Sequence, residues 1–162
     1  MGRHRGFTLI EIAVVVLIIT IVLGIVGVNL IPDRDAALRD EAKRLALLLQ
    51  SAQQESILQD KIIVVAIDRQ GYHFLVLDDA SELTPLSHDD AFYPRKLPQD
   101  ITISSVDIDG VPVLEKPRLI MLPTGELPDF SVIFSRGETR WEVKGLLSGN
   151  ITAQAAPAPG KA

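Results

Sequence analysis

The chain has 162 residues, a length typical of one domain with room for one modest core. Its formal net charge of −5 disfavours general binding to nucleic acid, because an acidic chain repels a phosphate backbone. Cysteine is absent, which excludes disulfides, cysteine-based metal sites and thiol nucleophiles. The mean hydropathy of +0.24 arises because the apolar residues are concentrated in one early block.

That block is the run from residue 7 to residue 31, in which Glu11 is the one charged residue. The uncharged part, residues 12–31, would span about 30 Å as a helix, which is the thickness of the hydrocarbon core of a bilayer. The run is longer than the apolar region of an ordinary signal peptide, and no A-x-A-like cleavage site follows it. We therefore expect a retained transmembrane helix over residues 7–31.

The charges on either side of the run predict its orientation. Arg3, His4 and Arg5 precede it, and Asp33 and Asp35 follow it. The positive-inside rule places residues 1–6 in the cytoplasm and the bulk of the chain on the other side of the membrane, which in a bacterium is the periplasm.

Glu11 is the anomaly of this segment, because an unpartnered carboxylate inside a membrane helix costs a few kcal/mol. Two interpretations are open from the residue alone. Glu11 lies close enough to the headgroups to be partly hydrated, or it pairs with a cation of a neighbouring chain.

The sequence Gly6-Phe7-Thr8-Leu9-Ile10-Glu11, between a short basic leader and a long apolar run, resembles the processing motif of type IV pilins and type II secretion pseudopilins. The resemblance implies that residues 1–6 are a leader peptide and that a prepilin peptidase cleaves between Gly6 and Phe7. It also implies N-methylation of Phe7, and pairing of Glu11 with the Phe7 amine of the adjacent subunit during assembly.

A second helix is predicted within residues 32–60. Pro32 must end or kink the apolar helix, since it lacks an N–H and clashes with the preceding turn. From Ala36 to about Leu58, apolar residues recur at spacings of four, three, four and three. We expect this stripe to pack on a sheet of the same chain; it consists of Leu38, Ala42, Leu45, Leu49 and Ala52.

Residues 61–152 predict a periplasmic β-domain, because short apolar runs alternate there with turn residues. The expected strands are mostly antiparallel and cover Ile62–Ile67, Tyr72–Leu77, Ile101–Ile108, Arg118–Leu122, Phe130–Phe134, Thr139–Lys144 and Leu146–Thr152. Pro112 makes Val111–Leu114 an edge strand or an irregular segment. Residues 78–99 are expected to form one long loop, and the Ala/Pro-rich residues 153–162 a disordered tail. The fold class is α+β.

The segments Leu119–Glu126, Phe130–Phe134 and Gly149–Ile151 resemble the H-type minor pseudopilins of type II secretion. This resemblance implies a pilin-like fold, with two sheets against the helix. It implies a structural role near the tip of a periplasmic fibre that supports export of folded proteins across the outer membrane. The implied partners are the major pseudopilin and other minor pseudopilins. A minor pilin of a type IV pilus, acting in assembly, adhesion or DNA uptake, is the alternative.

Other functions have little support in the sequence. No nucleotide-binding, catalytic-triad or metalloprotease motif is present, so we expect no enzyme activity, no cofactor, no metal site and no small-molecule substrate. Carboxylates do gather in the loop from Asp78 to Asp90, and carboxylates suit Ca²⁺. Their spacing matches no EF-hand, and whether this loop binds calcium stays open.

Overall fold

The computed structural model describes residues 9–28, 34–78, 80–86 and 90–157. The chain divides into two compact units, and the boundary in the sequence lies between Arg34 and Asp35. The first contains helix α1, Leu9–Val28, in which Thr20 Oγ1 donates a hydrogen bond to Val16 O at 2.8 Å. Over the described residues, no helix has the length and hydropathy that crossing a membrane requires. Residues 7, 8 and 29–31 of the segment predicted to cross the membrane lie outside the described part, as do Gly6 and Pro32.

Helix α2, Arg34–Gln59, belongs to the globular unit except for its first residue. Each residue of the predicted apolar stripe is 0% exposed. Ser56 is also buried on this helix, and its Oγ lies 2.6 Å from Lys61 O and 3.0 Å from Met121 O. The helix stops at Asp60, whose φ of 53° is the left-handed conformation common just after a helix end.

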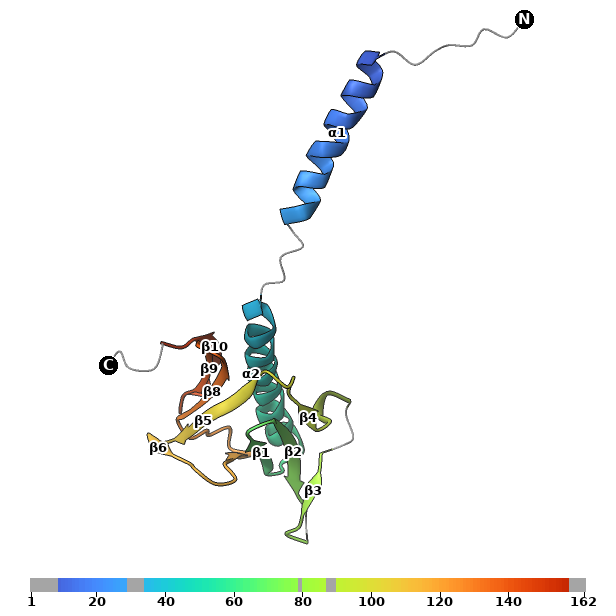
Figure 1. Cartoon of the computed structure of the whole chain (residues 1–162). Helices are drawn as coiled ribbons and strands as arrows, with labels where there is room; N and C mark the ends of the chain where they lie inside the picture. Colours follow the sequence, from blue (N-terminus) through green and yellow to red (C-terminus); the bar gives the residue numbers. More distant parts are fainter. Residues whose placement is uncertain (1–8, 29–33, 79, 87–89, 158–162) are drawn as a thin grey trace, which may run out of the picture. The chain divides into compact units, whose positions relative to one another are not determined.

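The first sheet has the strand order β3-β2-β1-β7, and β4 also pairs with β2. Figure 1 labels strands β1 to β4 of this sheet. All its pairings are antiparallel. Arg69 and Gln70 form the two-residue turn of the β1–β2 hairpin, where Gln70 N donates to Asp68 Oδ1 at 2.7 Å. The bounds are β1 Ile63–Asp68, β2 Gly71–Leu77, β3 Leu83–Pro85, β4 Arg95–Lys96 and β7 Arg118–Met121.

The second sheet has the order β10-β9-β8-β5-β6 and is also antiparallel. Strand β6 is an edge strand, as Pro112 predicted. The bounds are β5 Thr102–Ile108, β6 Val111–Pro112, β8 Phe130–Arg136, β9 Thr139–Gly145 and β10 Ile151–Ala155.

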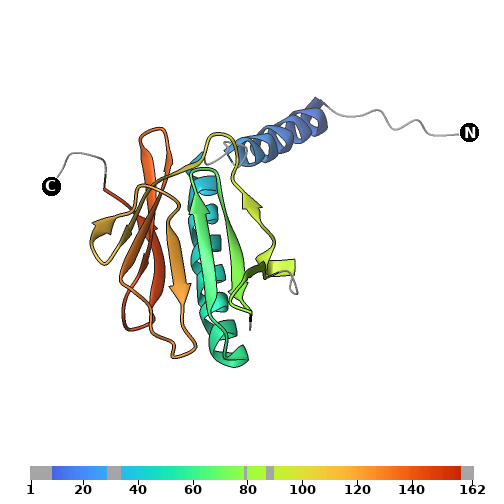
Figure 2. The same ribbon diagram turned by 90° about the horizontal axis from the view of Figure 1, so that it is seen from below.

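The two sheets and α2 enclose one hydrophobic core, and Figure 2 shows α2 running behind the strands. Leu45 of α2, Phe74 and Leu119 of the first sheet, and Val132 and Phe134 of the second are all buried in it. The predicted α+β class, with a long helix packed on two antiparallel sheets, is therefore confirmed.

Two expectations for individual segments were wrong. Residues 78–99 do not form one irregular loop, because their described part contains β3, the short 3₁₀ helix η1 (Asp90–Phe92) and β4. The segment is polar in composition, but three of its apolar side chains are buried in the core: Leu86, Phe92 and Leu97.

The predicted position of the last strand, Leu146–Thr152, was also wrong. Residues 146–150 form a turn, in which Gly149 N donates to Leu146 O at 2.8 Å and Gly149 has a φ of +84°. Strand β10 therefore starts at Ile151 and continues to Ala155, into the predicted tail, because pairing with the backbone of β9 does not require large apolar side chains. Residues 158–162 of that tail lie outside the described part.

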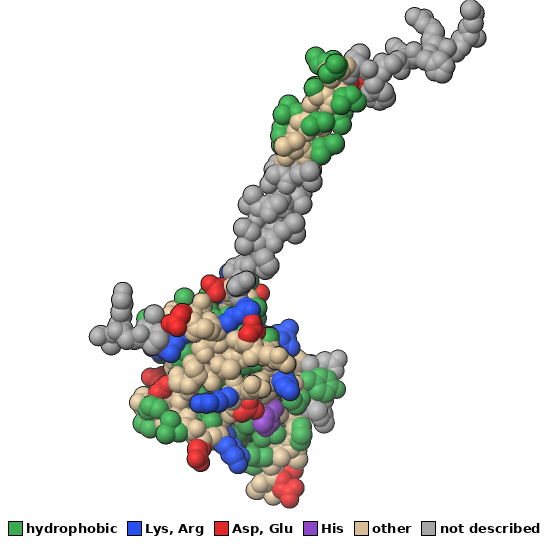
Figure 3. Space-filling model, viewed as in Figure 1, with side chains coloured by type: hydrophobic (Ala, Val, Ile, Leu, Met, Phe, Trp, Pro, Cys, Tyr) green, Lys and Arg blue, Asp and Glu red, His purple; other side chains and the backbone are tan. Residues whose placement is uncertain are grey.

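Basic and acidic side chains are interspersed over the face of the globular unit seen in Figure 3. Arg136, at the end of β8, forms an ion pair with Asp100. This face therefore does not present the extended basic surface that contact with a phosphate backbone requires.

Candidate functional site

The first candidate site is the N-terminal processing motif, of which the structure describes the part from Leu9 onward. Glu11 lies in the first turn of α1 and is exposed. A carboxylate is favourable at a helix N-terminus, where backbone N–H groups lack helical partners. Glu11 therefore presents a negative charge at the start of an otherwise apolar helix. Gly6 and Phe7 lie outside the described residues, so their geometry relative to Glu11 is not part of the structure.

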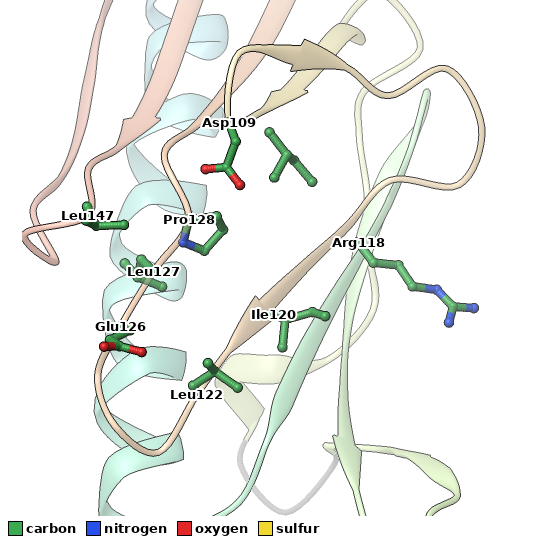
Figure 4. A pocket seen from close by; sticks show the side chains of 9 residues that line it. Asp109, Arg118, Ile120, Leu122, Glu126, Leu127, Pro128 and Leu147 are labelled. Atoms are coloured by element: carbon green, nitrogen blue, oxygen red, sulfur yellow. The ribbon is translucent and has the colours of Figure 1, made fainter.

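The second candidate site is a groove of about 680 Å³ between the two sheets (Figure 4). Apolar side chains predominate in its lining, and Ile120 and Leu147 are 47% and 70% exposed. The lining comes from β7, the end of β5, the turns after β5 and β9, and the connection between β7 and β8. It comprises Ile108, Asp109, Arg118, Ile120, Leu122, Glu126, Leu127, Pro128 and Leu147.

Hydrogen bonds between three loops fix the wall of this groove opposite β7. Asp109 Oδ1 accepts from Asp129 N at 3.1 Å, and Asp109 N donates to Asp129 O at 2.7 Å. Asp129 Oδ1 in turn accepts from Leu147 N at 2.7 Å. The turn after β5, the connection before β8 and the turn after β9 are thereby held together, so the groove has a preformed wall.

A partly buried ion pair links the segment between β3 and β5 to α2. Glu41 is 8% exposed, and its carboxylate receives two hydrogen bonds from the Arg95 guanidinium, one of them from Nε at 3.2 Å. The hydrogen bond to Glu41 raises the pKa of Arg95. Close by, burial raises the pKa of Tyr72 to about 12, and the negative charge of Glu41 adds to this rise. Tyr72 and Arg95 also line a pocket of about 240 Å³ beside β2 and β4.

The acidic loop does not form a metal cluster within the described residues, where no three His, Asp or Glu side chains come together. Asp78 uses its carboxylate locally, since Oδ1 accepts from Ala80 N at 3.0 Å and from Glu82 N at 2.8 Å. Asp79, His88 and Asp89 lie outside the described residues.

The sequence indicated Glu11 through a continuous motif but gave no sign of the groove. The groove residues come from four separate segments between residues 108 and 147, and no spacing relates them. The one available signal was a set of apolar residues beside turns, such as Leu147, which is ambiguous without tertiary structure.

Comparisons with known proteins find similarity in the N-terminal motif, the overall sequence and the fold. Residues 1–27 match the family model of the prokaryotic N-terminal methylation motif. The chain is 28% identical over 146 residues to type II secretion system protein H of Pseudomonas aeruginosa, covering 80% of this chain and 82% of that protein. It is 29% identical over 128 residues to type II secretion system core protein G of Klebsiella pneumoniae, covering 69% and 90%.

The fold is similar to that of the minor pseudopilin EpsH from the type II secretion system of Vibrio cholerae. The TM-score is 0.65 at 19% identity, covering 79% of this chain and 98% of EpsH. The chain is thus similar to pilin-like proteins both in its N-terminal motif and in its two-sheet fold. The resemblance to the H-type minor pseudopilins of type II secretion is confirmed.

Proposed function

We propose that this protein is a structural minor pseudopilin of the type II secretion pseudopilus, placed near the fibre tip and supporting export of folded proteins across the outer membrane. The observation that carries the proposal is the combination of a methylation motif over residues 1–27 with a globular unit of one helix and two antiparallel sheets. The relatives described above are components of type II secretion, which favours this system over a type IV pilus.

The proposal includes processing and anchoring of the N-terminus. A prepilin peptidase cleaves between Gly6 and Phe7, and Phe7 is then N-methylated while its amine keeps a positive charge. The apolar segment anchors the protein as a single-pass subunit of the inner membrane, with the N-terminus cytoplasmic and the β-domain periplasmic. Glu11 pairs with the Phe7 amine of the adjacent subunit, because a carboxylate that is costly alone in an apolar environment becomes tolerable when paired.

In this proposal the protein contributes its shape and its contact surfaces to the fibre. The partners are the major pseudopilin and other minor pseudopilins, and the protein performs no catalysis and binds no nucleic acid. Three observations on the described residues are consistent with such a role: the preformed groove, the mixed surface charge and the structural use of Glu41 and Arg95.

The test is a clean deletion of the gene in its host, scored for exoproteins in the medium and for surface pili with twitching motility. Loss of secretion with pili intact is expected. Loss of pili or twitching with secretion intact would instead assign the protein to a type IV pilus.

The cleavage site has a separate test. Replacing Gly6 by leucine should leave an uncut precursor, and N-terminal sequencing of the membrane fraction measures this. A mature protein of the Gly6→Leu variant that still begins at Phe7 would contradict the assignment.

A further inference from the structure

The outer edge of β7 has backbone groups without a strand partner. Within the described residues, β7 ends its sheet and pairs with β1 alone. Ile67 N donates to Pro117 O at 3.0 Å, so Pro117 forms a hydrogen-bonded pair with Ile67. Antiparallel pairing alternates, so Leu119 and Met121 direct their backbone groups toward β1, and Arg118 and Ile120 direct theirs away from it.

This edge differs from the other edges of the two sheets. Strand β3 ends in Pro85, β4 contains Lys96 and β6 contains Pro112, and proline and lysine are residues that protect an edge from further pairing. On β10, the Ile151 carbonyl accepts a hydrogen bond from Gln50 Nε2 at 2.7 Å. Strand β7 has only Arg118 at its start, followed by Leu119, Ile120 and Met121.

The apolar groove lies along this same strand. Figure 4 shows Leu127, Pro128 and Leu147 on the side of the groove away from β7, with Ile120 and Leu122 on the β7 side. The hydrogen bonds of Asp109 and Asp129 hold the far wall in place. An open hydrogen-bonding edge and an apolar channel beside it are the two features that bind an extended peptide by strand addition.

We propose that this groove accepts an extended segment of another pseudopilin subunit, which adds to β7 as an extra strand. The outward N–H and C=O groups of Arg118 and Ile120 pair with its backbone. Alternate apolar side chains of the segment fill the groove against Leu127 and Leu147. This inference rests on the proposed function, from which the identity of the partner as a neighbouring subunit follows.

The position of the groove in the globular unit agrees with such a neighbour. Gln53, in the last two turns of α2, donates from Nε2 to Gly125 O at 2.7 Å, and Gly125 precedes Glu126 in the groove lining. The groove therefore lies near the end of the unit where α2 terminates, which is opposite the end where the chain enters from α1. In a fibre of parallel subunits, that end faces the next subunit.

The first experiment is photo-cross-linking of the full chain in its host. A benzophenone amino acid replaces Leu147 on the groove wall, and a matched control places it at Leu114, which is 93% exposed and outside the groove lining. An adduct to a pseudopilin is expected from position 147 and not from position 114. An adduct from position 147 to an outer-membrane channel protein or to an exported protein would overturn the choice of partner.

The second experiment separates strand pairing from apolar contact. Ile120→Pro removes the outward N–H and leaves the bonds of Leu119 and Met121 to β1, and Ile120→Val keeps the N–H in a β-branched side chain. At least a tenfold loss of adduct from position 147, and a matching loss of exoprotein secretion, is expected for Ile120→Pro alone. Equal adduct and secretion in both variants would overturn strand addition.

Folding of the proline variant is checked by its thermal unfolding midpoint. Should Ile120→Pro unfold, amide hydrogen exchange decides instead, measured on the chain that keeps Ile120 and carries the benzophenone at position 147. The Ile120 N–H should exchange at least tenfold more slowly in the cross-linked assembly than in the same chain before irradiation, and unchanged exchange would contradict the proposal. Two outcomes separate this inference from the proposed function. Normal secretion after gene deletion would contradict the proposed function itself. Lost secretion after deletion, together with normal secretion by a folded Ile120→Pro variant, would contradict strand addition alone.

Discussion

Phe130 on β8 lies directly opposite Gly145 on β9, and its ring fills the space that a side chain at position 145 would need. A Cβ placed on Gly145 would lie 2.1 Å from Phe130 Cε1. Phe130 is buried in the core shared by α2 and both sheets, so its ring has little freedom to move aside. The missing side chain at Gly145 therefore leaves room for the Phe130 ring across β9.

Gly145→Ala should lower the free energy of unfolding by about 1–3 kcal/mol, because it overpacks a filled site. Chemical denaturation followed by circular dichroism measures the change. Gly137→Asn is the matched control, since Gly137 has a φ of +58°, which asparagine tolerates, and nothing lies within 4 Å of its Cβ position. A Gly145→Ala protein as stable as the control would show that Phe130 can rearrange.

Tyr72→Phe should leave stability at pH 7 unchanged or raise it by about 1 kcal/mol. The Tyr72 hydroxyl is buried and has no hydrogen-bond partner among the described residues, and burying such a group costs about 1–3 kcal/mol. A loss of more than about 1 kcal/mol at pH 7 in the variant would instead reveal a hydrogen bond of this hydroxyl.

The same tyrosine predicts a pH dependence. Burial raises its pKa from 10.0 to about 12, so between these values the unfolded chain releases the proton while the folded chain retains it. Stability should therefore fall as pH rises from about 10 to about 12, with a total loss of about 3 kcal/mol at 1.36 kcal/mol per pKa unit. Denaturation curves across this range should show the decline in the unsubstituted protein and a correspondingly smaller decline in Tyr72→Phe.

Glu41→Gln should destabilise the protein by about 1–3 kcal/mol, because it removes a charged acceptor from Arg95 in a largely buried position. Replacing both partners by methionine should cost less than the sum of Glu41→Met and Arg95→Met made singly, since neither charge is then left unpaired. A double-mutant cycle by chemical denaturation measures this coupling. Strict additivity would mean that the ion pair does not hold the segment between β3 and β5 to α2.

Glu11→Ala and Glu11→Gln should leave cleavage and membrane insertion intact but reduce incorporation into the fibre by more than about tenfold. Breaking a buried charge pair costs about 3–5 kcal/mol, which is ample for such a loss. The amount of the subunit in sheared or cross-linked fibres measures the effect, and Glu11→Asp, which keeps the charge, should be the mildest variant. Normal incorporation of Glu11→Gln would eliminate the pairing with the Phe7 amine.

The sequence by itself determined the features that depend on neighbours in the chain. The motif from Gly6 to Glu11 and the apolar stripe from Leu38 to Ala52 are local patterns, and helical periodicity converts the stripe directly into a buried face. Strands with clear turns between them, such as β1 and β2, were located to within about a residue for the same reason. The class of the fold followed from these elements and from the family resemblance.

Only the tertiary structure decided which distant segments lie together. The side chains of Leu86, Phe92 and Leu97 are buried in the core, although their neighbours in the sequence are polar. The end of β10 at Ala155 depends on backbone pairing with β9, which small side chains neither favour nor prevent. The groove beside β7 depends on the order of strands in two sheets and on the hydrogen bonds of Asp109 and Asp129, and no local pattern encodes either, because such contacts join residues 18 to 20 positions apart.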